Sequence, residues 1–129
     1  MIDQEQALSA YVQLALVSHE KGQRPARDRF LLLAGAAACR AGVLAAAERC
    51  RQLIVASSPG HQLVEYDSFP DAMRSADFRL LMDRWEKKCP YELAEHLLLQ
   101  LGRTPRGVDE SERVDEFVLN CLDEIEPGG

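Results

Sequence analysis

Apolar residues recur at spacings of three and four along most of the chain, and turn-forming residues separate one such segment from the next. This spacing places apolar side chains on one face of an α-helix. The segments with this pattern are residues 3–21, 43–57, 77–88, 90–101 and 111–125, and residues 30–41 are almost entirely Ala, Leu, Gly and Cys. A short helix is also expected to begin at Ser68, which can cap it. The pattern predicts an all-α fold.

The expected architecture is a compact single-domain bundle of about six helices. A chain of 129 residues has the usual length of one domain and can bury enough surface for a core of its own. The single helical domain is expected to span residues 1–126, and residues 127–129 are expected to form a short flexible tail. Asp3 is the expected cap of the first helix, and the last helix is expected to begin at Ser111.

Residues 30–59 are expected to form a helical hairpin at the centre of the protein. Alanine favours helix because it loses no side-chain entropy, so the run from Leu31 would continue but for Gly42. Glycine readily adopts the left-handed conformation that ends a helix, and Arg40 suits the C-terminal end just before it. The second helix is expected to run from Val43 to Ser57 and to stop before Pro59.

This hairpin resembles a single tetratricopeptide repeat, which is a helix-turn-helix unit of 34 residues. The positions that match the repeat when its central Ala is placed at Ala46 are Phe30, Leu33, Ala34, Leu53 and, one residue late, Pro59. The resemblance covers residues 27–59 and implies two closely packed helices.

The chain also departs from that repeat. Ala37 and Cys50 stand where the family usually carries large aromatic residues. No second copy follows, because Asp67 and Ser68 fall where the repeat has Leu and Gly, whereas arrays usually need three or more copies. Repeat ancestry and simple Ala-rich packing both remain open as explanations.

Composition excludes several classes of protein. The net charge of −6 argues against a protein whose main task is to neutralise nucleic-acid phosphates. No apolar run has the length of a membrane span. Four widely spaced cysteines without a signal peptide favour free thiols in a reducing, cytoplasmic setting.

The sequence contains no recognisable catalytic motif. His19, His61 and His96 have no metal-ligand spacing with one another or with the cysteines. It contains no CxxC pair, Gly-rich phosphate loop, GxSxG elbow or HExxH pair. We therefore name no catalytic residue, metal site or cofactor, and we favour a binding protein over an enzyme. An enzyme that assembles its site from scattered residues remains an alternative.

Two segments carry the candidate binding residues. The first is the densest positive cluster in the chain, formed by Arg24, Arg27 and Arg29 with Lys21 nearby. Such a cluster is commonly a solvated face, and the functional alternative is a docking patch for an acidic peptide, phosphate or nucleic acid.

The second segment is the loop of residues 60–70, which combines turn formers with apolar residues. Its candidate binding residues are His61, Tyr66 and Asp67, since loops often carry function. The alternative that we favour is an apolar plug over the hairpin, folded as an extended segment or a single helical turn.

Three functional hypotheses follow from these features. The leading one is a protein–protein interaction module, an adaptor or scaffold that binds a protein or peptide partner in a groove beside the hairpin. The second is a small-molecule binder or enzyme with a pocket under the 60–70 loop. The third is a nucleic-acid accessory factor that uses residues 21–29, which the acidic net charge disfavours. A homo-oligomer is compatible with all three.

Overall fold

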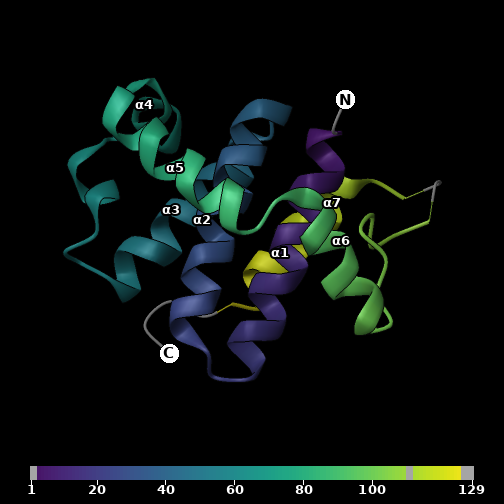
Figure 1. Ribbon diagram of the computed structural model, residues 1–129. Helices are drawn as coiled ribbons and strands as arrows, with labels where there is room; N and C mark the ends of the chain where they lie inside the picture. The colour runs from purple at the N-terminus through teal and green to yellow at the C-terminus, as the bar shows by residue number, and fades with distance from the viewer. Residues whose placement is uncertain (1–2, 110–111, 126–129) are drawn as a thin grey trace.

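The computed structural model describes residues 3–109 and 112–125, and these residues fold entirely into helices and loops (Figure 1). The elements are α1 (Gln4–Glu20), α2 (Arg24–Ala41), α3 (Leu44–Ser57), the 3-10 turn η1 (Gln62–Glu65), α4 (Phe69–Arg74), α5 (Ala76–Lys88), α6 (Tyr91–Gln100) and α7 (Val114–Asp123). The predicted all-α fold is confirmed. The seven α-helices of the described part include the short one expected after Ser68.

The centre of the molecule is the pair formed by α1 and α2. Every residue of α1 from Ala7 to Leu16 is buried, because α2, α6, α7 and the 103–107 loop together surround this helix. The predicted hairpin is present as α2 and α3, and Gly42 ends α2 with a φ of 78°. The expectation that this hairpin alone forms the centre is wrong, because α1 is apolar on more than one face and takes the inner position.

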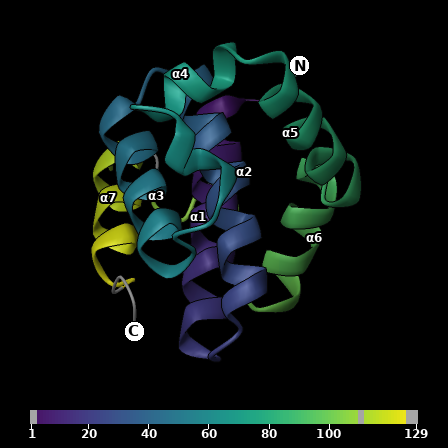
Figure 2. The ribbon, with the colours of Figure 1, turned by 90° about the vertical axis from the view of Figure 1, so that its left-hand side faces the viewer.

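The remaining helices cover this pair from two sides. In Figure 2, α3 and α7 lie on one side of the α1–α2 pair, and α5 and α6 lie on the other. Contacts between α3 and α7 and between α2 and α5 agree with this arrangement. A single core of apolar side chains runs through these layers.

The helix ends follow the local signals in the sequence. Asp3 caps α1 by accepting the backbone N–H groups of Glu5 and Gln6, as predicted. The Ser68 hydroxyl accepts the N–H of Asp71 at 3.2 Å and so caps α4. The predicted helix start at Ser111 and the predicted tail at residues 127–129 lie outside the described residues, and the described part of the last helix begins at Val114.

The 60–70 loop carries a single 3-10 turn, and two of its apolar side chains are buried in the core. Leu63 and Phe69 are completely buried, and the Phe69 ring makes an edge-to-face contact with Phe78 at 5.7 Å. The ring also occupies the space where a Cβ on Gly35 would lie, which explains why α2 carries a glycine there. The plug interpretation of this loop is therefore confirmed.

The 103–107 loop closes the opposite side of the core mainly through hydrogen bonds. The Gln13 amide donates to the Thr104 carbonyl at 2.9 Å, and the Ser9 hydroxyl donates to the Arg106 carbonyl at 2.8 Å. These two buried polar side chains of α1 thus satisfy carbonyls that the loop cannot pair by itself. In the described part of the chain, no helix is long and apolar enough to span a membrane.

Candidate functional site

A groove with two hollows separates the first half of α2 from α5. The larger hollow, of about 450 Å³, also reaches the C-terminal end of α3 and the start of the 60–70 loop. Its lining includes Arg24, Asp28, Arg29, Ser58, His61 and Trp85. The smaller, of about 160 Å³, is lined by Ala26, Arg29, Phe30, Leu33, Trp85, Lys88 and Cys89. Both share Arg29 and Trp85, and we call the whole surface the α2–α5 groove.

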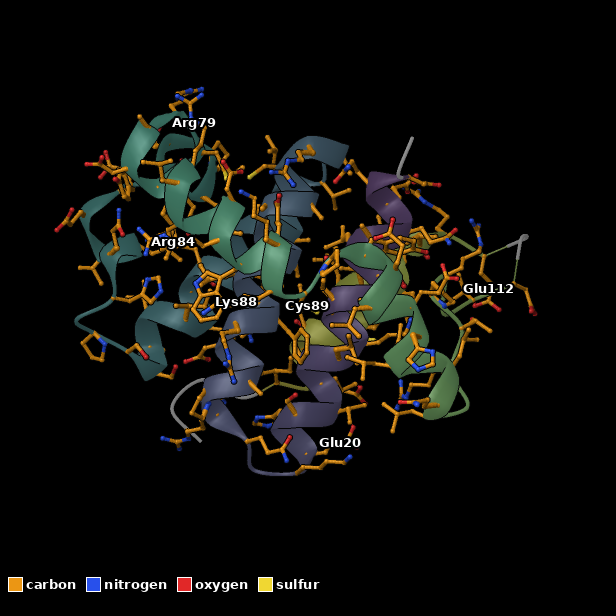
Figure 3. The ribbon with its side chains drawn as sticks, viewed as in Figure 1. Glu20, Arg79, Arg84, Lys88, Cys89 and Glu112 are labelled. Carbon is orange, nitrogen blue, oxygen red and sulfur yellow. The ribbon has the colours of Figure 1, made fainter. Side chains whose placement is uncertain are left out.

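Two cationic side chains lie over the Trp85 ring of α5 in this groove. The Arg29 guanidinium carbon is 5.6 Å from the ring centroid, and the Lys88 ammonium nitrogen is 4.8 Å from it. Both distances are within the range of cation–π attraction. Figure 3 shows Lys88 and Cys89 at the C-terminal end of α5, on the same face of the molecule as Arg84. The groove therefore has an aromatic wall bordered by positive charge.

Beneath the groove lies a closed polar network, which we call the Arg27 network. The Arg27 side chain is 2% exposed, and its Nε donates to the Asp28 carboxylate at 3.1 Å. The second oxygen of Asp28 accepts the Ser57 hydroxyl at 2.8 Å. On the other side, Nη1 of Arg27 lies 3.2 Å from Nδ1 of His19, and because a guanidinium can only donate, Nδ1 is the acceptor. The network joins the ends of α1 and α3 to the start of α2.

The structure therefore divides the predicted arginine cluster into two parts. Successive helical residues are about 100° apart, so Arg27 and Arg29 point about 200° apart around α2. Arg27 faces α1 and α3 and is buried, whereas Arg24 and Arg29 are exposed and line the groove. The prediction that places Arg27 in a solvated binding cluster is wrong, because a buried guanidinium requires the partners that Asp28 and His19 provide.

His61 extends the groove from the loop side. Its Nδ1 accepts the backbone N–H of Leu63 at 3.0 Å, so the neutral ring carries its proton on Nε2. Burial lowers the pKa of His61 below its ordinary value, although the nearby Asp28 carboxylate acts in the opposite direction. The effect of burial is the larger one, so the imidazole that caps the 3-10 turn is neutral at pH 7.

The other two candidate residues of the loop do not line the α2–α5 groove. The Tyr66 hydroxyl lies 3.0 Å from the Ser75 hydroxyl, and its ring contacts Phe78 with centroids 6.0 Å apart. Asp67 is exposed. The space under the loop is occupied by Leu63 and Phe69, so the hollow nearest the loop lies beside it, at His61.

The charges of the groove do not cancel. Arg24, Arg29 and Lys88 are exposed, and none of them forms an ion pair with another described residue. The carboxylate of Asp28 is the acidic group of the lining, and its charge is balanced by Arg27 beneath it. The groove thus presents excess positive charge on a chain whose net charge is −6.

The described residues contain no activated catalytic group in this groove. Burial raises the pKa of the Cys89 thiol, which lines the smaller hollow, so the thiol stays protonated at neutral pH. Burial likewise raises the pKa of Cys39 and Cys121 to about 11. Over residues 3–109 and 112–125, no three His, Cys, Asp or Glu side chains are placed to hold a metal ion. The groove combines exposed cations with apolar side chains.

Comparison of the chain with protein-family models, with curated proteins and with solved structures returned no match. The resemblance of the α2–α3 hairpin to a tetratricopeptide repeat therefore stays a prediction.

The sequence indicated the position of the central residue of the groove but not its role. Trp85 falls on the apolar stripe of α5 with Phe78 and Met82, so its spacing predicts a core residue whose ring edge lies near the surface. In the structure it is half-buried, and its ring borders both hollows between α2 and α5. The sequence signal for an exposed ring edge was Lys88, one turn after Trp85 on the same helix. A tryptophan in the core would not have a lysine side chain beside its ring.

Proposed function

We propose that this protein is a protein–protein interaction module whose α2–α5 groove binds a peptide segment of its partner. The observation that carries this proposal is the half-buried Trp85, which lines both hollows between exposed cations that have no ion-pair partner among the described residues. Tryptophan and arginine are the residues that most often dominate the free energy of protein interfaces.

The rigidity of the groove supports the same function. Its two walls are helices, and the Arg27 network ties the start of α2 to the ends of α1 and α3. A preformed surface loses little conformational entropy on binding, so more of the contact free energy appears as affinity. The absence of an activated nucleophile among the groove residues makes binding, rather than catalysis, the better use of this surface.

Capture from a lysate of the native host tests this proposal. The bait proteins are the wild type, the groove variant Arg24→Gln/Arg29→Gln and the control variant Arg79→Gln/Lys87→Gln. The control removes the same charge from α5 at two exposed positions that line neither hollow. Circular dichroism and thermal unfolding establish that all three baits are folded.

We expect the wild type and the control to retain the same discrete protein after nuclease treatment, and the groove variant to lose it. A partner retained equally by all three baits would contradict the proposal. Recovery of nucleic acid alone, lost on nuclease treatment, would also contradict it and would favour a nucleic-acid accessory factor.

A further inference from the structure

We infer that the segment bound in the α2–α5 groove is an acidic peptide with one large apolar side chain, and that Arg29 moves from Trp85 to the peptide when it binds. This inference rests on the proposed function and specifies the chemistry of the partner. It follows from the different linings of the two hollows and from the position of Arg29 between them.

The polar end of the larger hollow matches a carboxylate, whereas the rest of its lining is mainly apolar. Two guanidinium groups, Arg24 and Arg29, border it, and the neutral His61 can donate from Nε2. Arginine pairs with carboxylates through parallel hydrogen bonds, which makes it well suited to this recognition. The Asp28 carboxylate does not oppose the ligand strongly, because it already accepts hydrogen bonds from Arg27 and Ser57.

The smaller hollow matches an apolar side chain. Ala26, Phe30 and Leu33 form its α2 wall, and Trp85 forms part of the opposite wall. Its volume of about 160 Å³ is that of a single large side chain rather than of a cofactor. An apolar group buried here would cover the aromatic ring, which is the part of the groove that water solvates least well.

Arg29 lies at the boundary of the two hollows. In the structure its guanidinium lies over the Trp85 ring, and its Nε donates to the Pro25 carbonyl at 3.3 Å. Neither contact is strong, since an exposed cation–π pair and a long hydrogen bond each contribute little. A carboxylate in the larger hollow offers Arg29 a stronger partner, and the ring is then free to pack against the apolar side chain.

The length of the groove sets the length of the segment. From Arg24 to Leu33, α2 rises about 14 Å. An extended peptide covers that distance in about four residues, so one acidic and one apolar side chain a few residues apart can reach both hollows. A probe of about eight residues leaves flanks on both sides.

Trp85 is the only tryptophan of the chain, so its fluorescence reports directly on the groove. The probe peptide carries one Phe flanked by Glu and Asp residues. Two comparison peptides replace either the Phe with Ser or the acidic residues with Lys. We expect the probe to change the Trp85 emission in a saturable way, with an affinity at least about tenfold higher than that of either comparison peptide. Added salt should weaken it.

The charge-reversal variant Arg24→Glu/Arg29→Glu should lose the probe and prefer the Lys peptide, whereas Arg79→Glu/Lys87→Glu should bind the probe within about twofold of the wild type. Equal binding of acidic and Lys peptides, equal loss in both variants, or no saturable change with the probe would overturn the inference. In each of these cases, a partner captured through the groove would still support the proposed function, so the two proposals fail separately.

Discussion

Arg27 and Arg29 lie two residues apart on α2, yet their surroundings differ in almost every respect. Arg27 is 2% exposed and is held by Asp28 and His19 at 3.1 and 3.2 Å. Arg29 is exposed, and its guanidinium lies over Trp85 at 5.6 Å. The first has an ion-pair partner and a second hydrogen-bonding partner inside the protein, whereas the second has no ion-pair partner among the described residues. One short basic segment can therefore supply both the internal support of a groove and its binding surface.

The largest effect should come from removing the buried arginine. Arg27→Ala leaves the Asp28 carboxylate half-buried without its cation, and breaking a buried pair in this way costs about 3–5 kcal/mol. Arg29→Ala, the matched control, should cost less than about 1 kcal/mol, because it removes an exposed cation–π contact. Urea unfolding followed by circular dichroism measures both. Equal losses of unfolding free energy in the two variants would show that the buried and the exposed side of α2 contribute alike to stability.

A double substitution tests whether Arg27 and Asp28 act as a pair. Asp28→Asn alone should destabilise the fold by about 1–3 kcal/mol, because Arg27 loses a charged acceptor. Arg27→Met/Asp28→Asn should cost clearly less than the sum of the losses measured for Arg27→Met and for Asp28→Asn. The reason is that the double variant leaves no uncompensated charge. A double-mutant cycle from urea unfolding gives the coupling. Additive losses would mean that the two side chains support the fold independently.

Two neighbouring serines lie at different distances from Asp28 in the Arg27 network. Ser57 donates to Asp28 at 2.8 Å, whereas the Ser58 hydroxyl is 3.4 Å from the same oxygen. Ser57→Ala should therefore cost about 0.5–1.5 kcal/mol, and Ser58→Ala should cost less. Thermal unfolding of the two variants measures the difference. A larger loss of stability in Ser58→Ala than in Ser57→Ala would show that Ser58 is the serine that links α3 to α2.

The smallest effect concerns pH and His61. Burial lowers its pKa, so the folded protein favours the neutral ring; its contribution to stability is complete above the ordinary pKa and is lost as the pH falls through the lowered value. His61→Asn keeps a capping oxygen that does not titrate. The melting temperature of the wild type should therefore fall more than that of the variant between pH 8 and pH 5. Parallel profiles would exclude this role of His61.

The parts of the fold that the sequence predicted are those set by local chemistry. The Asp3 and Ser68 caps, the left-handed Gly42 and the apolar stripe of α5 all follow from one or two turns of chain. The central position of α1 was missed because it depends on the three helices and the loop that meet around it. Local spacing identifies an apolar face, but it does not say how many neighbours cover a helix.

The candidate site was predicted only in part, and for a similar reason. Arg24, Arg29 and His61 meet at one hollow, although His61 is distant in sequence from the arginines. Arg27 could not be separated from them by composition, since its burial depends on where α1 and α3 end. Trp85 was expected in the core with its ring edge near the surface, but its place in a groove beside Arg29 depends on how α5 lies against α2. Each of these features depends on contacts between elements that are distant in the sequence.

The most direct test of the account uses Trp85 fluorescence in Arg24→Gln/Arg29→Gln. Separate samples are titrated with the acidic Phe peptide and with urea, because bound peptide would raise the unfolding free energy of the wild type, and the same ring reports both binding and unfolding. We expect loss of the peptide response and an unfolding free energy within about 1 kcal/mol of the wild type, because both arginines are exposed. Retained binding, or a loss of stability as large as that of Arg27→Ala, would contradict the assignment of the groove side of α2 to binding.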